Sequence, residues 1–129
     1  MGPVKTSIRR RYHFESAHHL PKVPENHRCH RIHGHNYEME VEVTGPLMTG
    51  LYGGFVFDFW ALDAVVNPLL ATVDHRLLND VEGLENPTAE LIATWFLEKI
   101  DKALALPASQ VTSVSIYETK DAIATVTRI

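Results

Sequence analysis

Ile32-His-Gly-His-Asn-Tyr-Glu-Met-Glu-Val-Glu-Val-Thr44 is the stretch that decides the fold, because apolar and acidic residues alternate along most of it. A period of two is the repeat of a β-strand, in which successive side chains point to opposite faces. Glutamates occupy the positions between the apolar ones and form the second face. We therefore predict a strand over residues 32–44, whose apolar face consists of Tyr37, Met39, Val41 and Val43.

The segments around this strand predict three more. Residues 4–18 alternate well enough for a strand, with Ile8 and Phe14 an even number of positions apart. The intervening residues 20–28 contain two prolines among polar residues, which is typical of a loop. Two closing strands are predicted near the end of the chain, over about 111–119 and 122–128.

Two helices are predicted between these pairs of strands. Asp58 can cap a helix over about 59–72, in which Pro68 marks a bend or a break. Asn86 as N-cap and Pro87 in the first turn favour a second helix over about 87–104. The apolar spacing of the second helix predicts a buried stripe of Leu91, Trp95, Ile100 and Leu104.

The predicted order is β-β-α-α-β-β in a single domain spanning residues 1–129. Two hairpins that flank two helices favour an α+β fold, with a four-stranded antiparallel sheet and both helices on one face. Such a sheet has two edge strands, and unprotected edges invite pairing with another copy. We expect a homo-oligomer, whose number of subunits this pattern does not set.

Composition excludes several classes of protein. No stretch approaches the roughly 20 apolar residues that span a bilayer, so no membrane partner is expected. The single cysteine, Cys29, excludes an internal disulfide framework and suits a reducing compartment, the cytoplasm. The net charge is −4, and the basic segment lacks interleaved aromatic residues, so no nucleic-acid partner is expected. Residues 1–31 nevertheless contain seven Lys or Arg against two Glu, which suits either a small polyanion or a solvated strand face.

Seven of the eight histidines lie between His13 and His35, and packing alone explains such crowding poorly because buried imidazoles need partners. His33 and His35 leave the same face of one strand, and His18 can meet them across the hairpin. Three converging neutral imidazoles form a catalytic zinc site whose fourth position is open to water or substrate. The remaining histidines of the segment are expected to face away or to be solvated: His13, His19, His27 and His30.

Four further residues carry groups that could do chemistry. Cys29 could be a fourth zinc ligand, a thiolate base beside the metal or an inert core residue. Asp74 and His75 could act together as an acid–base pair, or they could be a capping residue beside a solvated imidazole. Glu118 shares a strand face with apolar residues, and a buried carboxylate there would need a strong donor such as a guanidine-like group.

Six blocks of residues, in order across nearly the whole chain, resemble the 6-pyruvoyltetrahydropterin synthase family. Three residues separate Cys29 from the His-Gly-His motif, which resembles the bacterial 6-carboxytetrahydropterin synthase branch of queuosine biosynthesis; the pyruvoyl-forming branch usually has five. The six blocks that carry the resemblance are Phe14–His18, Cys29–Tyr37, Phe57–Phe59, Asp74–Asn79, Glu85–Glu90 and Glu118–Thr119.

The resemblance implies a tunnelling fold, in which trimers form a barrel and stack into a hexamer with active sites between subunits. It implies conversion of 7,8-dihydroneopterin triphosphate to 6-carboxy-5,6,7,8-tetrahydropterin, acetaldehyde and triphosphate. It assigns one zinc ion per subunit to His18, His33 and His35. It assigns proton transfer to Cys29, Asp74 and His75, and the pterin anchor to Glu118.

Three other functions fit the same residues. Elimination of triphosphate without carbon–carbon cleavage would make the chain a 6-pyruvoyltetrahydropterin synthase, which the cysteine spacing disfavours. Zinc and general bases could also support an aldolase-like split of dihydroneopterin. A non-catalytic oligomeric zinc module, with Cys29 as fourth ligand, would leave Glu118 and the Asp74–His75 pair without a role.

Overall fold

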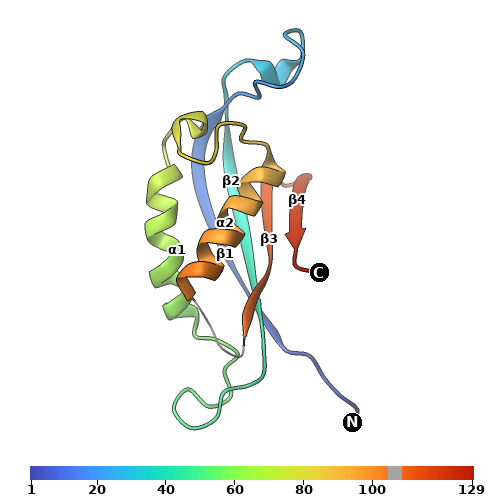
Figure 1. Cartoon of the computed structure of the whole chain (residues 1–129), viewed down its shortest axis with the longest axis vertical. Helices are drawn as coiled ribbons and strands as arrows, with labels where there is room; N and C mark the ends of the chain where they lie inside the picture. Colours follow the sequence, from blue (N-terminus) through green and yellow to red (C-terminus); the bar gives the residue numbers. More distant parts are fainter. Residues whose placement is uncertain (105–108) are drawn as a thin grey trace.

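The computed structural model describes residues 1–104 and 109–129, and it confirms the predicted order of elements. The strands form one antiparallel sheet in the order β1-β2-β3-β4, and both helices cover the same face of it (Figure 1). The fold is therefore α+β, as predicted. The elements are β1 (Ser7–His18), η1 (Arg28–His30), β2 (His33–Thr44), α1 (Phe59–Val73), η2 (Leu78–Asp80), α2 (Ala89–Leu104), β3 (Gln110–Thr119) and β4 (Ala122–Thr127), where η denotes a short 3₁₀ turn.

The two faces of the sheet follow from the alternation along β2. Every apolar position of the predicted face, from Tyr37 to Val43, is fully buried against the helices. Each buried apolar side chain of this size contributes about 1.5–3 kcal/mol. On the opposite face, the β2 glutamates are paired with β1 arginines. Arg9 Nε lies 3.2 Å from Glu42 Oε2, and Arg11 Nε lies 2.9 Å from Glu40 Oε2.

Helix α1 begins where it was predicted to begin, because Asp58 Oδ1 accepts a hydrogen bond from the Trp60 backbone N–H at 3.1 Å. Pro68 neither ends nor breaks this helix, which continues to Val73. Pro68 is exposed, so water can satisfy the Ala64 carbonyl that loses its helical donor. A proline on the solvent side of a helix is thus tolerated.

Two details of the prediction for α2 were wrong. The helix begins at Ala89, and its N-cap is Thr88 rather than Asn86: Thr88 Oγ1 accepts the Leu91 backbone N–H at 3.1 Å. Leu91 is 44% exposed, so it lies outside the buried stripe. The predicted Trp95 and Ile100 are buried, and the stripe also contains Ile92, Ala93, Phe96 and Leu97.

The topology brings several chain segments together at one end of the sheet, the upper end in Figure 1. β1, β3 and α1 end there, whereas β2 and α2 begin there. Residues 19–32, which include η1, extend beyond this end of the sheet (Figure 1). Every residue singled out for chemistry lies at this end, either in these strands or in the loops that follow β1 and α1. Within the described residues, no helix is long and apolar enough to cross a membrane.

Candidate metal centre and active site

Three histidines converge on the helix-covered face at this end of the sheet. In the β1–β2 pairing, His18 lies opposite His33 and Ser16 lies opposite His35. This register places all three imidazoles on one face, as the spacing predicted. The ring centroids are 4.5 Å apart for His18 and His33, and 5.0 Å apart for His33 and His35. One ligand atom from each ring lies within 4.8 Å of the other two, so the three residues could hold a metal ion.

Backbone carbonyls fix the orientation of two of these rings. His18 Nδ1 lies 2.8 Å from the Pro87 carbonyl oxygen, and His33 Nδ1 lies 2.7 Å from that of Arg31. A carbonyl oxygen only accepts, so each Nδ1 must donate. In the neutral ring Nε2 then carries the lone pair. Protein metal sites commonly orient their histidines in this way.

The surroundings of the cluster also favour a metal. Burial lowers the pKa of His18 and the pKa of His35, which keeps both rings neutral at pH 7 and able to coordinate. Three buried polar atoms have no hydrogen-bond partner there: His18 Nε2, His35 Nε2 and the Tyr37 hydroxyl. An unsatisfied buried polar group costs about 1–3 kcal/mol. A bound cation would satisfy both nitrogens, so the donor set fits a divalent metal.

Glu118 lies against this histidine cluster. Its Oε2 is 3.1 Å from His35 Nε2 and 3.6 Å from His18 Nε2. Its side chain is 29% exposed, so the carboxylate is reachable from solvent. Burial, and to a smaller extent the nearby Glu118 charge, raise the pKa of the Tyr37 hydroxyl. Because it contacts two imidazoles and is partly exposed, the Glu118 carboxylate lies between the histidine cluster and solvent.

Cys29 lies in η1 and its side chain is free and partly buried. Two hydrogen bonds position its backbone. Its N–H donates to His27 Nδ1 at 3.0 Å, and its carbonyl oxygen accepts the Leu20 N–H at 2.8 Å. Among the described residues, the group of potential metal ligands contains the three histidines without Cys29.

Asp74 and His75 follow the last residue of α1 and contact each other. His75 Nδ1 lies 3.0 Å from Asp74 Oδ1, and this oxygen also accepts the Glu15 backbone N–H at 2.9 Å. That backbone donor, followed by the His75 charge, lowers the pKa of Asp74. His75 Nε2 lies 3.5 Å from Glu15 Oε2. Carboxylates thus lie beside both nitrogens of this imidazole, an arrangement suited to proton transfer.

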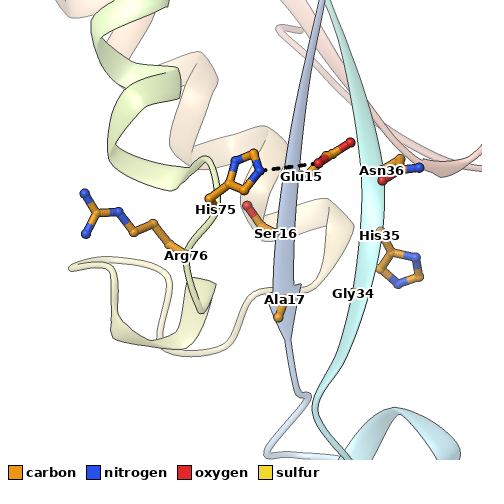
Figure 2. Close-up of a pocket in the computed structure, with 8 residues that line it drawn as sticks. All are labelled: Glu15, Ser16, Ala17, Gly34, His35, Asn36, His75 and Arg76. Atoms are coloured by element: carbon orange, nitrogen blue, oxygen red, sulfur yellow. Dashed lines mark ion pairs between the residues drawn. The ribbon is translucent and has the colours of Figure 1, made fainter.

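This pair is separate from the histidine cluster of the same chain. The backbones of Glu15 and His75 are joined by a hydrogen bond along the outer edge of β1, and the His75 side chain is 73% exposed. A cavity of about 530 Å³ lies over this edge, and Figure 2 shows the His35 ring pointing away from His75. The cavity is lined by Glu15, Ser16, Ala17, Gly34, His35, Asn36, His75 and Arg76.

Three residues near the site were not assigned roles from the sequence. Tyr37 could have been, because it lies two positions after His35 on the same strand face. Glu15 and His27 could not, because their contacts depend on how the loop and the end of α1 fold back on β1. His27 acts through its ring nitrogen as the cap of η1, a role that usually belongs to Ser, Thr, Asp or Asn.

Comparisons with known proteins agree with this fold. The family model described as 6-pyruvoyl tetrahydropterin synthase matches residues 7–128. The 6-carboxy-5,6,7,8-tetrahydropterin synthase of Synechocystis sp. is 39% identical over 115 residues, which cover 87% of this chain and 85% of that protein. The dihydroneopterin monophosphate aldolase of Pyrococcus furiosus is 38% identical over 101 residues, covering 78% and 80%. The solved structure of Caenorhabditis elegans 6-pyruvoyl tetrahydropterin synthase superposes with a TM-score of 0.85 at 29% identity, covering 98% and 97%.

Proposed function

Because this chain belongs to the 6-pyruvoyl tetrahydropterin synthase family, we propose that it is a lyase, a 6-carboxytetrahydropterin synthase. The reaction converts 7,8-dihydroneopterin triphosphate and water to 6-carboxy-5,6,7,8-tetrahydropterin, acetaldehyde and triphosphate, in queuosine (7-deazaguanine) biosynthesis. The observation that carries the proposal is the convergence of His18, His33 and His35, with two Nδ1 atoms held by carbonyls. The tunnelling fold, shared with the Caenorhabditis elegans enzyme, supports it.

The metal of this site is zinc, with one ion per subunit. Three neutral imidazoles leave one position of a tetrahedral ion free, which is the usual donor set of catalytic zinc. Bound there, zinc would polarise oxygen substituents of the substrate side chain and stabilise the negative charge that develops on them. The protein's own contribution is to orient the rings, and the hydrogen bonds to the carbonyls of Pro87 and Arg31 support that role.

Cys29 is the base that removes a proton from the substrate side chain. Its backbone is hydrogen-bonded to His27 and Leu20, which limits where the thiol can go. Cys29 lies four residues before His33, and a thiolate close to a metal bound there would be stabilised, which suits a cysteine base.

Asp74 and His75 form the second proton-transfer pair. Asp74 holds His75 Nδ1, and Nε2, which lies beside the exposed Glu15 carboxylate, exchanges a proton with substrate. Since this pair lies at the β1 edge, away from the histidine cluster of its own chain, we assign it to the site of a neighbouring subunit. The assembly is then a hexamer of two stacked trimers. Edge strands β1 and β4 support such pairing, because each has a strand partner on one side only within the described residues.

The substrate has two charged or polar ends that need partners. Glu118 anchors the guanidine-like edge of the pterin, and its partial exposure beside the cluster suits this role.

The triphosphate needs cations that are not already paired. Arg9, Arg10 and Arg11 each contact a carboxylate, so they are poor candidates. The remaining cations of the loop and η1 region are Lys22, Arg28 and Arg31.

The enzyme is cytoplasmic in this proposal, because its free thiol must stay reduced to act as a base. One domain spans residues 1–129, and neither nucleic acid nor a membrane takes part. The only partners are a reduced pterin triphosphate and further copies of the same chain.

A product assay tests the proposal. Zinc-loaded protein is incubated with 7,8-dihydroneopterin triphosphate beside the variant Cys29→Ala. We expect a 6-carboxy pterin and acetaldehyde from the unmodified protein, and a rate lower by about 10²–10⁴-fold from the variant with its zinc retained. A 6-pyruvoyl product would move the chain to the other branch of the family. Loss of zinc from the variant, with no turnover by either protein, would favour a structural zinc site.

Aldol-type cleavage of a dihydroneopterin phosphate is a second candidate, favoured by the 38% identity to the Pyrococcus furiosus aldolase. The same cysteine, imidazole pair and metal could break the first side-chain carbon–carbon bond without loss of phosphate. That reaction leaves a 6-hydroxymethyl pterin and a phosphorylated two-carbon aldehyde. Assays with dihydroneopterin monophosphate and triphosphate in parallel separate the two functions by product.

A further inference from the structure

The contact between Glu118 and the histidine cluster is not explained by a role as pterin anchor alone. β3 and β2 are antiparallel, and their last pair before this end of the sheet is Tyr117 with Glu38. Glu118 follows, where the register with β4 shifts between Tyr117 and Thr119, and its carboxylate contacts histidines on the helix-covered face. Its Oε2 is thereby placed 3.1 Å from His35 Nε2 and 3.6 Å from His18 Nε2.

Without a cation, the contact between Glu118 and His18 brings electron-pair donors face to face. His18 gives its only ring proton to the Pro87 carbonyl, so the Nε2 of the neutral ring has a lone pair and no proton. An ionised carboxylate is likewise only an acceptor. The two histidine Nε2 atoms are buried and have no hydrogen-bond partner. A cation shared by the carboxylate and the imidazoles removes this conflict.

The spacing between the Glu118 carboxylate and two of the imidazoles, those of His18 and His35, also agrees with ligands of one tetrahedral ion. Zinc lies about 2.0–2.1 Å from a histidine nitrogen and about 2.0–2.2 Å from a carboxylate oxygen. Two ligands of a tetrahedral ion at such distances are about 3.3 Å apart. The two measured distances, 3.1 and 3.6 Å, lie on either side of that value.

We propose that Glu118 is the fourth ligand of the metal in the substrate-free enzyme and leaves it when a pterin binds. This inference rests on the proposed function and gives Glu118 a second role in it. The amino-pyrimidine edge of a pterin offers the carboxylate two parallel N–H donors, which is a favourable bidentate contact. Taking that contact removes the carboxylate from the metal and frees one coordination position for an oxygen of the substrate side chain.

The consequence is a metal site that opens only for the correct ring. In the resting enzyme, the carboxylate closes the site to water and small anions. The side chain is 29% exposed, so it has room to turn outward and a binding pterin can reach it. Molecules that lack the guanidine-like edge then meet a closed metal, which adds selectivity ahead of the chemical steps.

The test uses cobalt in place of zinc, because Co²⁺ in the same site has visible absorption that reports its ligands. Azide, a small anion, is titrated into the cobalt-loaded unmodified protein, into Glu118→Gln and into the control Glu98→Gln, whose carboxylate is exposed on α2. We expect Glu118→Gln to bind azide at least about tenfold more tightly than the other two, because an open position has replaced a ligand. Its zinc affinity, measured with a competing chelator, should fall about 10–100-fold or more.

A second arm tests release by the ring. Plain pterin, which has the amino-pyrimidine edge but no side chain, is added to the cobalt-loaded unmodified protein. We expect azide to bind about as tightly as in Glu118→Gln, and we expect no effect of pterin on azide binding by that variant. Equal azide affinity of the unmodified protein and Glu118→Gln would overturn the inference. If pterin binds but leaves the cobalt spectrum unchanged, the proposed release of Glu118 from the metal is wrong.

These outcomes are distinguishable from failure of the proposed function. The comparison of the unmodified protein with Glu118→Gln needs no substrate, so it holds or fails whichever pterin reaction the enzyme performs. The product assay, in turn, does not depend on the resting ligand of the metal. Thermal unfolding of the metal-free variants checks that Glu118→Gln is folded like the control.

Discussion

His18 lies directly opposite His33 in the β1–β2 ladder, and the two ring centroids are 4.5 Å apart. The two rings are held by different parts of the chain. His18 donates to the carbonyl of Pro87, just before α2, whereas His33 donates to that of Arg31, in the loop between the strands. The cluster therefore joins the sheet, the start of α2 and the loop that carries Cys29.

Replacing one ligand should remove the metal. His33→Ala leaves two imidazoles, so we expect the zinc content of the purified protein to fall from about one ion per chain to well below half. His13→Ala is the control, because His13 is exposed and pairs with Glu38 on the other face of the sheet. Elemental analysis after dialysis against a weak chelator measures the difference. Full retention of zinc by His33→Ala would place the metal elsewhere.

The stability of the metal-free protein should fall in mildly acidic solution. Burial makes the pKa of His18 and the pKa of His35 lower in the folded chain than the value of about 6.5 in the unfolded chain. Below pH 6.5 the unfolded chain therefore binds more protons than the folded one, and protonation favours unfolding. We expect the free energy of unfolding to decrease from pH 7.5 to pH 5.5, measured with urea. The same decrease in His13→Gln would exclude that exposed histidine as its source, and equal stability at both pH values would contradict the prediction.

The hydrogen bond from the Cys29 N–H to His27 Nδ1 should matter for turnover. We expect His27→Ala to lower kcat/KM about tenfold, because loss of the cap lets the thiol move from its place. His27→Asn keeps a side-chain acceptor at the cap and should restore most of the activity. Two further measurements separate a displaced thiol from general damage to the protein. In His27→Ala the alkylation rate of Cys29 should change, whereas the zinc content should not. Equal activity of the alanine and asparagine variants would count against a positioning role.

Mixing two inactive variants tests whether neighbouring chains share a site. Cys29→Ala and His75→Gln each remove one proton-transfer group, and each should be nearly inactive alone. If the two groups come from different subunits, co-expression in equal amounts gives about a quarter of the sites both intact groups. We expect activity to return to about that fraction, measured per zinc. No recovery in mixed oligomers, identified by two affinity tags, would mean that each site draws both groups from one chain.

The N-cap of α2 should contribute measurably to stability. Thr88 Oγ1 accepts the Leu91 N–H, so Thr88→Ala should lower the free energy of unfolding by about 1 kcal/mol. Asn86→Ala is the matched comparison, because Asn86 is the cap expected from the sequence, and it should cost less. Urea unfolding of both variants compares the two losses in the free energy of unfolding. A larger loss in Asn86→Ala would show that the helix end is held mainly from the turn before it.

The sequence by itself determined the sheet and the faces of its strands. The alternation along β2 is local, because side chains of a strand point to opposite faces whatever the strand packs against. From this period alone, His33 and His35 had to leave the same face as Tyr37, Met39 and the valines. The loop of residues 20–28 made a hairpin of β1 and β2, and so His18 met them.

Only the tertiary structure decided which groups complete the site. The carbonyl of Pro87 reaches His18 because α2 packs on the sheet, and Glu118 reaches His35 because β3 pairs with β2. The Asp74–His75 pair lies on the β1 edge instead, where the end of α1 folds back along Glu15. Such contacts join residues far apart in the sequence, and their geometry depends on packing, which leaves no period in the chain. Local patterns fix the direction of a side chain, and only packing fixes what it meets.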